Sequence, residues 1–298
     1  MKKKKILVTG ATGQVGLPFS LCHAAENELW AIARFSDQGK RDALEAAGVH
    51  CRQVDLLEGD FSSLPNDFDA VFHFAVARSG GEDFDSELRE NAEATGALMS
   101  FCRDAGSFFY CSSSAVYQSA GDALFSEDSP LGDHHRCLMP TYSIGKIAAE
   151  AVVRFCAREY QLPTLICRLN TPYGESGWPF YHLLMMKQGA EIPLHSDCGS
   201  RYTLIHQDDI NRLAPQLLSA ASVPAAVFNF SGQEHVGIAQ WCDYIAELTG
   251  LEAKYCKTVD TLQSVCTDNS KMQAHTGPAS VSWREGIRAM VERAGALK

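Results

Sequence analysis

A tyrosine and a lysine four residues apart carry the clearest chemical potential in this sequence. In Tyr142-x-x-x-Lys146 the spacing places both side chains on one face of a helix, where the ammonium can stabilise a phenolate. A phenol whose pKa is lowered in this way takes a proton from an alcohol while a hydride leaves the same carbon, and returns it in the reverse reaction. Because such pairs occur by chance on many helices, the meaning of this one depends on its surroundings.

A glycine-rich motif follows the first apolar run of the chain. Residues 9–16 read TGATGQVG. Gly10 can supply a tight turn, Gly13 lets the backbone approach a pyrophosphate, and Gly16 permits close packing of a helix on a strand. The N-terminus of the following helix would face the phosphate charge. A strand before the motif and a helix after it predict a dinucleotide-binding loop.

The end of the second strand commonly selects between the two nicotinamide cofactors. An acidic residue there binds the ribose hydroxyls of NAD, whereas a nearby arginine suits the 2′-phosphate of NADP. Here Arg34 stands at the tip, and Asp37 follows in what reads as a loop. We therefore expect NAD or NADP, with Arg34 favouring NADP, unless Arg34 is solvated or stacks on adenine. Asp55, after the third strand, could accept a hydrogen bond from the adenine amino group.

Composition excludes several classes of function. The sequence is 46% hydrophobic and 21% charged, as in ordinary globular chains, and its formal charge of -10 opposes nucleic-acid binding. Basic residues cluster only at 2–5, the apolar run that follows is too short for a signal peptide, and nothing resembles a membrane span. The 11 cysteines contain no C-x-x-C pair and the 10 histidines no H-E-x-x-H. We expect a cytoplasmic protein with free thiols and no metal.

Short apolar runs alternate with helix-like stretches through the first part of the chain. This rhythm predicts an α/β fold with a doubly wound, Rossmann-type parallel sheet. Residues 1–170 would form the dinucleotide-binding domain, parts of about 201–232 would return to it, and 171–298 would form mainly a smaller C-terminal substrate-binding region whose core includes Phe180 and Tyr181. The predicted strands are Lys5–Val8, Leu29–Phe35, His50–Val54, Ala70–Val76, Ser107–Ser112 and Thr164–Arg168, and the predicted helices are Gly13–Ala24, Lys40–Ala47, Phe84–Ala105, Tyr142–Tyr160 and Ala239–Leu248.

Four further segments complete a pattern. Strand five ends in three serines (112–114), strand four in HFAV (73–76), strand six leads into RLNTPYG (168–174), and RYTLIHQDD occupies 201–209. Together with the glycine loop and the Tyr–Lys pair, these motifs resemble the extended short-chain dehydrogenase/reductase family, the NAD-dependent epimerase/dehydratase group, which acts mostly on nucleotide sugars.

The resemblance assigns roles to individual residues. It implies a catalytic set of Ser113, Tyr142 and Lys146, in which Ser113 hydrogen-bonds the reacting oxygen and Lys146 also holds the nicotinamide ribose. Expected substrate contacts are Ser114, Asn170 and Arg201, whose guanidinium would meet a nucleotide diphosphate. Expected cofactor contacts are Gly10, Thr12, Gly13, Gln14, Val15, Gly16, Arg34, Asp55, Leu56, Phe74, Ala75 and Lys146.

Departures from the family pattern narrow the reaction. Its dehydratases carry Asp and then Glu directly after the catalytic Ser/Thr, and its double epimerases a Cys, where this chain has Ser114 and Ala115. We therefore prefer epimerisation of a sugar nucleotide through a transient ketone. An NAD(P)H-dependent reductase or dehydrogenase of a sugar or other carbonyl or alcohol is the alternative. A non-catalytic dinucleotide-sensing regulator stays open, although a sensor needs no Ser-Tyr-Lys set. The family expectation is a homodimer.

Overall fold

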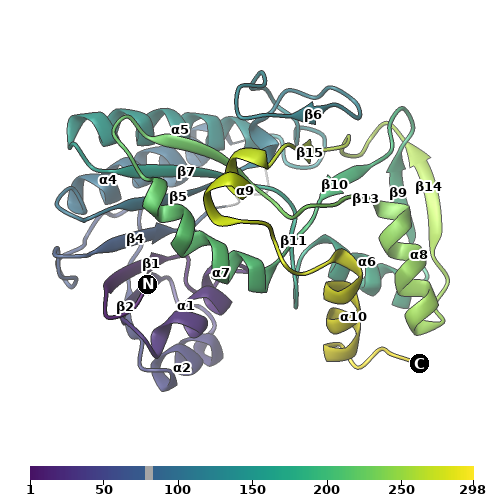
Figure 1. Ribbon diagram of the computed structural model, residues 1–298, viewed down its shortest axis with the longest axis horizontal. Coiled ribbons are helices and arrows are strands. Elements are labelled where there is room, and N and C mark those ends of the chain that lie inside the picture. The colour runs from purple at the N-terminus through teal and green to yellow at the C-terminus, as the bar shows by residue number, and fades with distance from the viewer. Residues whose placement is uncertain (78–82) are drawn as a thin grey trace. The chain divides into compact units, whose positions relative to one another are not determined.

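A parallel sheet of seven strands is the centre of the computed structural model, which describes residues 1–77 and 83–298 (Figure 1). The strand order is β12-β7-β5-β4-β1-β2-β3. The strands are β1 Lys5–Thr9, β2 Glu28–Ala33, β3 His50–Gln53, β4 Ala70–His73, β5 Phe108–Ser113, β7 Thr164–Leu169 and β12 Ala226–Phe230.

The strand order places the functional edge of the sheet. From β1 the chain runs outward through β2 to β3, then returns to the other side of β1 and continues through β4, β5, β7 and β12. Ligands of such sheets bind at the carboxyl ends of the strands where the order reverses, here between β1 and β4. The prediction of a doubly wound, Rossmann-type fold is confirmed. All six predicted strands are present, and β12 is a seventh.

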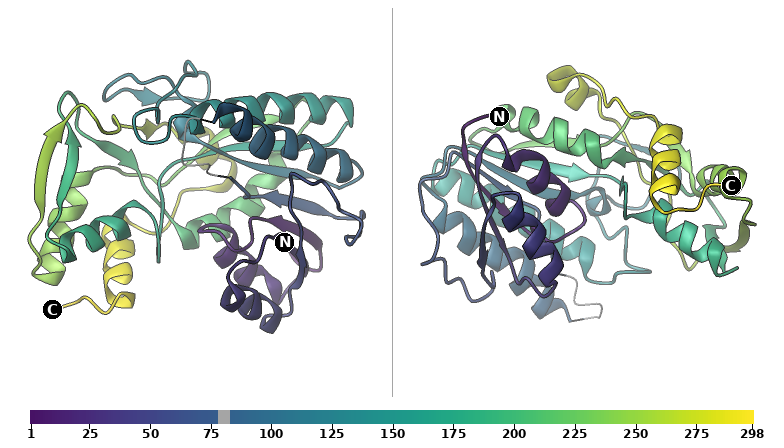
Figure 2. Two further views of the ribbon diagram at one scale, coloured as in Figure 1. Left: turned by 180° about the vertical axis from the view of Figure 1, so that it is seen from behind. Right: turned by 90° about the horizontal axis from the view of Figure 1, so that it is seen from below.

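Helices cover both faces of the sheet, which explains why its central strands β1, β4, β5 and β7 are buried and mostly apolar (Figures 1 and 2). On one face Phe19 packs 4.6 Å from Phe72 between ring centroids. On the other face Tyr110 shares a buried cluster with Leu98 and Val153. Helices α1 (Gly16–Ala24), α2 (Gln38–Ala46) and α7 (Gln207–Leu217) lie on the first face, and α4 (Ala94–Phe101) and α5 (Tyr142–Glu159) on the second.

The third predicted helix, Phe84–Ala105, is broken into three pieces. A short α3 (Phe84–Glu87) leads into a π-helical turn, Leu88–Glu93, which continues as α4. A π-turn widens the helix and commonly marks a functional position. Asn91 lies inside it and is buried. This local widening has no signature in the apolar periodicity, so the sequence predicted one helix.

The chain divides into two compact units. The first contains Met1–Ser113, Thr141–Arg168 and Asn211–Phe228, and the second contains Ser114–Pro140, Leu169–Ile210 and Asn229–Lys298. The chain therefore leaves the first unit directly after β5 and re-enters it directly before α5.

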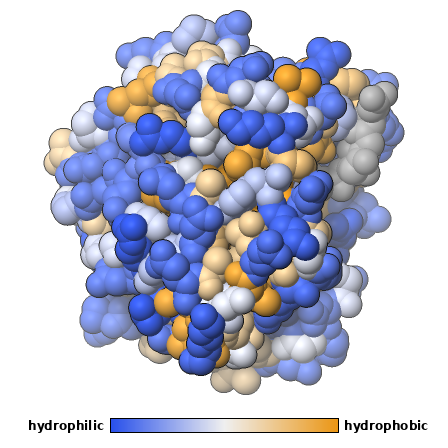
Figure 3. All heavy atoms as spheres, turned by 90° about the vertical axis from the view of Figure 1, so that its right-hand side faces the viewer, coloured by the Kyte–Doolittle hydropathy of each residue, from blue (hydrophilic) through white to orange (hydrophobic). Residues whose placement is uncertain are grey.

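The second unit is built from short elements around one aromatic core. Trp241 and Tyr173 are among its buried side chains. Figure 3 shows that the side of the molecule carrying α8 and β14 has apolar side chains scattered among hydrophilic ones. The strands are β6 Leu124–Phe125, β8 Pro172–Tyr173, β9 Glu191–His195, β10 Arg201–Thr203, β11 Ile205–His206, β13 His235–Gly237, β14 Lys254–Thr258 and β15 Cys266–Thr267, and the helices are α6 Trp178–Lys187, α8 Ile238–Thr249, α9 Ser270–Thr276 and α10 Trp283–Arg293.

Two expectations need correction. Tyr181 is 48% exposed on α6, so its assignment to the core is wrong, while Phe180 packs partly buried against the core. The second strand ends at Ala33 instead of Phe35, because Phe35 has a φ of 48° that no extended strand accommodates. Asp37 lies in the loop between β2 and α2, as the sequence predicted. It is the N-cap of α2, where its carboxylate accepts a hydrogen bond from the backbone N–H of Lys40 at 3.2 Å.

Candidate active site

The glycine loop needs its glycines for close approach of the backbone. Gly10 has a φ of 66°, and a Cβ at this position would lie 2.6 Å from the nitrogen of Ala75. A Cβ at Gly16 would lie 2.3 Å from the carbonyl oxygen of Gly10, so Gly16 packs on the loop itself. Gly13 is exposed. A side chain at Gly10 or at Gly16 would push the loop apart, which fits a cradle for a pyrophosphate.

The segment after β4 is hydrogen-bonded to the residue that precedes the glycine loop's first glycine. The backbone N–H of Ala75 donates to the hydroxyl of Thr9 at 3.2 Å, and the N–H of Phe74 donates to the carbonyl of Thr9 at 3.3 Å. The ring of Phe74 is buried, 5.1 Å from that of Phe19. The side chain of Phe74 therefore belongs to the core, and a ligand would meet this segment through its backbone or through half-buried Ala75.

Positive charge gathers beside the tip of β2. Arg34 is exposed just after the strand, and Lys40 reaches from α2 to donate to the carbonyl of Thr12 at 3.1 Å. Lys40 also lies 3.9 Å from the carboxylate of its neighbour Asp37. Thr12 belongs to the glycine loop, so Lys40 is a basic residue of this site that the sequence analysis missed. A lysine one turn into the helix, three residues after an N-cap aspartate, was the available signal.

The residues after β3 are also at this edge. Asp55 is exposed, and its carboxylate accepts a hydrogen bond from the N–H of Leu57 at 2.9 Å, which forms a local turn. One oxygen of the Asp55 carboxylate is therefore used to stabilise this turn. Leu56 is half-buried against the core of the first unit.

Lys146 is the most deeply buried member of the predicted catalytic set. It is 4% exposed, and its ammonium donates to the carbonyl of Cys111 at 2.9 Å, near the end of β5. The nitrogen also lies 5.1 Å from the ring centroid of Tyr110. Burial lowers the pKa of Lys146, but the electrostatic influence of Tyr110 and Tyr142 outweighs it, so the pKa is raised above its ordinary value. The side chain is a fixed positive charge at neutral pH.

The other two candidate catalytic residues lie at the end of β5 and at the start of α5, at the carboxyl edge of the sheet. Ser113 is the last residue of β5 and Tyr142 the first of α5, and both are half-buried. Because Lys146 lies one turn into α5 and contacts β5, the start of this helix is held beside the end of that strand. Tyr142 and Ser113 therefore belong to the edge at which the glycine loop also lies.

A buried ion pair fixes α5 against the sheet. Glu150, two turns after Tyr142, accepts hydrogen bonds from Arg168 Nε at 3.0 Å and Nη2 at 2.9 Å. It also accepts one from the hydroxyl of Ser112 at 2.6 Å. The carboxylate thereby joins α5 to both β5 and β7, one residue from Ser113. Bidentate pairs of this kind hold their partners in one geometry.

The predicted substrate residues belong to the second unit. Ser114 is buried at the start of a 3-10 turn. Asn170 is buried, and its amide group donates to Val265 and Thr267 and accepts from Thr171, so its hydrogen-bonding groups serve the fold. Arg201 is exposed, and its guanidinium donates to the carbonyl of His235 at 3.3 Å. Of these three, Arg201 has the donors to spare for an anionic ligand.

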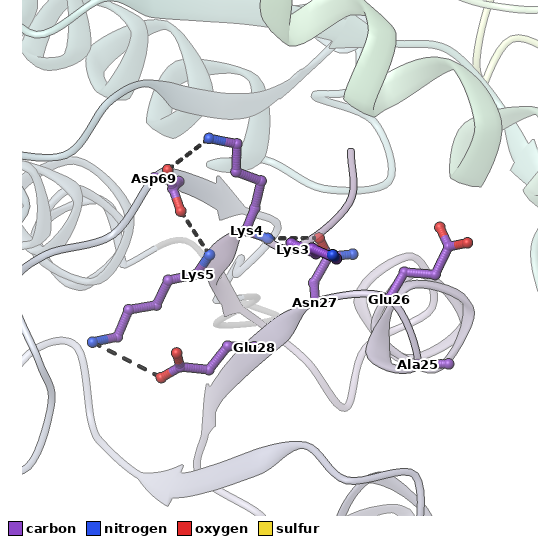
Figure 4. Close-up of a pocket in the computed structure, with 8 residues that line it drawn as sticks. All are labelled: Lys3, Lys4, Lys5, Ala25, Glu26, Asn27, Glu28 and Asp69. Atoms are coloured by element: carbon purple, nitrogen blue, oxygen red, sulfur yellow. Dashed lines mark hydrogen bonds and ion pairs between the residues drawn. The ribbon is translucent and has the colours of Figure 1, made fainter.

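A hollow at the opposite edge of the sheet has a different character (Figure 4). There Lys4 pairs with Asp69 at 2.9 Å, and Lys5 lies 3.8 Å from Glu28. The basic run at the N-terminus is thus balanced by acidic neighbours and offers no concentrated positive charge. The hollow is lined by Lys3, Lys4, Lys5, Ala25, Glu26, Asn27, Glu28 and Asp69.

Residues 1–77 and 83–298 offer neither a cluster of metal ligands nor a membrane-spanning helix. Within them, no group of three or more His, Cys, Asp or Glu side chains is placed to hold a metal ion. The same ranges contain no helix whose length and apolar character would allow it to span a bilayer.

The fold and the edge just described define a class of protein. A Rossmann-type sheet, a glycine loop after its first strand and a Tyr–Lys helix after its fifth are the arrangement of extended short-chain dehydrogenases/reductases, which are NAD(P)-dependent enzymes. The model of the NAD dependent epimerase/dehydratase family matches residues 6–230. The chain belongs to this family.

Individual relatives resemble the chain over nearly its whole length. The low-salt glycan biosynthesis protein Agl12 of Haloferax volcanii is 25% identical, over 96% of this chain and 97% of that protein. MoeE5, solved with UDP-glucose and NAD, is 25% identical, with a TM-score of 0.82 over 98% of both chains. The UDP-glucuronic acid 4-epimerase of Bacillus cereus, solved with UDP-glucuronic acid and NAD, is 23% identical, with a TM-score of 0.80 over 97% of this chain and 99% of that one.

Proposed function

We propose that this protein is an NAD(P)-dependent epimerase of a sugar nucleotide, acting through Ser113, Tyr142 and Lys146. The observation that carries the proposal is the position of Lys146, buried against Cys111 of β5 one helical turn from Tyr142, at the edge that also holds the glycine loop. Support for the substrate class comes from MoeE5 and the Bacillus cereus epimerase, which bind UDP-sugars together with NAD.

The residues of this chain divide the work of such a reaction. The phenol of Tyr142 would take the proton of the reacting sugar hydroxyl and later return it, with the hydroxyl of Ser113 hydrogen-bonding the same oxygen. The ammonium of Lys146 stabilises the phenolate that forms. Bound NAD would supply the hydride acceptor and donor. The backbone at Gly10, Gly13 and Gly16 would hold its pyrophosphate, with Thr12, Gln14, Val15, Asp55, Leu56 and Ala75 beside it.

The absence of carboxylates after Ser113 favours epimerisation over dehydration. Ser114 and Ala115 follow it directly, and neither side chain can act as the acid or base that elimination of a hydroxyl requires. In the second unit, Arg201 is the residue that we assign to the diphosphate of the substrate, because a guanidinium binds phosphate oxygens in a bidentate manner.

One observation favours a reductase or dehydrogenase as a second candidate. Arg34 is exposed and Lys40 lies against Thr12 of the glycine loop, so two basic residues adjoin the place of the adenosine ribose. This arrangement suits the 2′-phosphate of NADP, the cofactor that reductases exchange at every turnover. Arg34→Ala should then weaken NADPH binding about tenfold, with NADH nearly unchanged, in a fluorescence titration of both nucleotides.

Identification of the bound nucleotide separates the two candidates. The purified protein is denatured without added nucleotide, and the released molecules are identified by mass. An epimerase returns its hydride to the same substrate and retains its cofactor, so stoichiometric NAD or NADH supports the epimerase and argues against NADP. A protein that releases nothing and then binds NADPH more tightly than NADH is a reductase.

Turnover tests the catalytic set directly. UDP-glucose, UDP-glucuronic acid and dTDP-glucose are supplied in turn, and the products are separated by chromatography. Tyr142→Phe should abolish the turnover found with the wild-type protein. Unchanged turnover in Tyr142→Phe would refute the catalytic assignment, and a bound dinucleotide with no turnover in either protein would favour a sensor.

We also propose a homodimer formed through α5. Phe155 is 62% exposed on this helix, and Ile144 and Ala151 are exposed as well. An exposed apolar stripe along a helix is typical of a helix-bundle interface. Phe155→Glu should halve the molar mass measured by light scattering. The matched control is Leu21→Glu on α1, an equally apolar exposed position on the other face of the sheet, which should leave the mass unchanged.

A further inference from the structure

A chain of buried polar side chains runs through the first unit and has no role in the chemistry assigned so far. It begins one residue before Gly10 of the glycine loop and ends one residue before Tyr142. Polar groups in a core cost free energy unless each is hydrogen-bonded, so a continuous chain of them calls for an explanation. Its members are Thr9, His73, Thr95, Asn91, Glu87 and Thr141.

The direction of each hydrogen bond in the first half follows from counting protons. The single hydroxyl proton of Thr95 is donated to the carbonyl of Asn91, so His73 must donate from Nε2 to the oxygen of Thr95, at 2.9 Å. Burial lowers the pKa of His73 to about 3, so the ring is neutral and its Nδ1 is an acceptor. The hydroxyl of Thr9 therefore donates to Nδ1 at 2.6 Å. This half links the glycine loop to the π-turn with every partner satisfied.

The second half meets at the carboxylate of Glu87, which is 3% exposed. The amide of Asn91 donates to Oε1 at 2.8 Å, and the hydroxyl of Thr141 donates to Oε2 at 2.9 Å. The same Asn91 side chain accepts from the N–H of Ala77 at 2.9 Å and donates to its carbonyl at 3.1 Å. Glu87 is thus connected both to the start of α5 and to the segment after β4.

The start of α5 is shaped to fit this carboxylate. Thr141 occupies the N-cap, yet its hydroxyl makes no cap bond and turns to Glu87 instead. A Cβ at Gly145 would lie 2.7 Å from Oε1, so only glycine lets the first turn approach so closely. A negative charge beside a helix N-terminus also interacts favourably with the helix dipole.

We infer that Glu87 is a positioning residue for Tyr142. Through Thr141 and Gly145 it fixes the first turn of α5, and through Asn91 it ties that turn to the segment after β4, which supports the glycine loop. The inference rests on the proposed function, because it assigns to Tyr142 a catalytic geometry worth holding. Glu87 itself is not proposed to touch substrate or cofactor.

The sharpest test changes Thr141, because the change removes a single hydrogen bond and keeps the charge. Thr141→Val has the same shape but cannot donate to Glu87, and Thr141→Ser restores the donor. We expect kcat to fall about tenfold in Thr141→Val with KM and the affinity for NAD unchanged, and to recover in Thr141→Ser. Glu87→Gln should stay close to wild type, because its amide can still accept from Asn91 and donate to the oxygen of Thr141.

Hydrogen–deuterium exchange gives a readout that needs no substrate. In Thr141→Val, exchange should accelerate in the first turn of α5 and in residues 74–77, while α1 and α2 keep their wild-type rates. Thr141→Ser should show no acceleration. Unchanged exchange at the start of α5, or an equal acceleration throughout the first unit, would overturn the inference.

The two hypotheses fail in different ways. If Tyr142→Phe keeps its turnover, the proposed function is wrong, and the exchange measurement alone decides whether Glu87 couples the two segments. If Tyr142→Phe is inactive but Thr141→Val turns over as fast as wild type, the function stands and the positioning role of Glu87 is wrong.

Discussion

The two edges of the parallel sheet use charged side chains in opposite ways. At the amino edge, Lys4 and Asp69 pair at 2.9 Å with 49% and 40% of their side chains exposed. At the carboxyl edge, Glu150 and Arg168 pair at the same distance with 2% of each exposed. Water screens the first pair and not the second. Charged side chains at the amino edge can therefore be replaced with little effect. At the carboxyl edge, where the proposed chemistry lies, they are held in fixed positions.

Replacing one lysine by alanine at each edge should give the largest difference, measured in kcat. Lys146→Ala removes the buried ammonium beside Cys111 and should lower kcat by about 10²–10⁴-fold, the range typical of lost acid–base assistance. Lys5→Ala, at the amino edge, is the control and should keep wild-type kcat. Steady-state kinetics on the sugar nucleotide identified above measures both. Equal effects of the two substitutions would erase the functional distinction between the edges.

Breaking the buried ion pair tests stability at the carboxyl edge. Arg168→Met removes both hydrogen bonds that Arg168 donates to the buried carboxylate of Glu150, while Arg154 stays 3.8 Å away, and should lower the free energy of unfolding by about 3–5 kcal/mol. Urea denaturation followed by circular dichroism measures this change. A loss below about 1 kcal/mol would mean that the pair is no more valuable than an exposed one.

Acid should weaken the protein through its buried histidines. The pKa of His73 is lowered by burial to about 3, so below pH 6.5 the unfolded chain binds a proton that the folded chain does not. Stability is therefore fully present above pH 6.5 and declines as the pH falls towards 3, by up to about 1.4 kcal/mol per pH unit for this group. Urea titrations at pH 7, 6 and 5 measure the slope.

The comparison between edges supplies the control for this prediction. His73→Asn should make the slope shallower, whereas His50→Asn, at the exposed start of β3, should leave it unchanged. If both variants kept the wild-type slope, the acid sensitivity would arise elsewhere, for example at His134 or His182, whose pKa burial lowers to about 4.

The smallest effect is expected from the exposed pair. Lys4→Met removes the ammonium but leaves Asp69 accepting from the backbone N–H of Lys5 at 2.8 Å. The free energy of unfolding should therefore change by less than about 1 kcal/mol, and less still in 1 M salt. A loss comparable with that of Arg168→Met would show that exposure does not distinguish the two edges.

The sequence could predict features that depend on residues close together along the chain. It could not predict those that depend on contacts between distant segments. The glycine loop is a local strand–turn–helix motif, and Tyr142 and Lys146 share a helix face, so both patterns could be recognised within short segments of the sequence. The catalytic role of the Tyr–Lys pair depended on the surrounding motifs and stays a prediction. Glu87 and Lys40 were missed because their roles depend on contacts with Thr141 and Thr12, which lie 54 and 28 residues away along the chain. Periodicity does not encode such contacts.

The predictions of a strand boundary and of burial failed for related reasons. Phe35 is apolar but its positive φ ends the strand before it, and Tyr181 is aromatic but points outward from α6. Asn170 matches a family position, yet in the structure its amide is engaged by Val265 and Thr267. At these positions, backbone conformation, burial and hydrogen bonding depend more on the neighbouring residues in the folded protein than on the residue type.

The position of β12 has a consequence for how the protein is made. This strand comes from residues 226–230 but completes the sheet beside β7, whose six residues are all buried. During synthesis, the edge of β7 must wait, unpaired, until some sixty further residues have left the ribosome, and such an edge invites pairing with other chains. A fragment of residues 1–225 should therefore aggregate, even though it contains every residue of the proposed catalytic set.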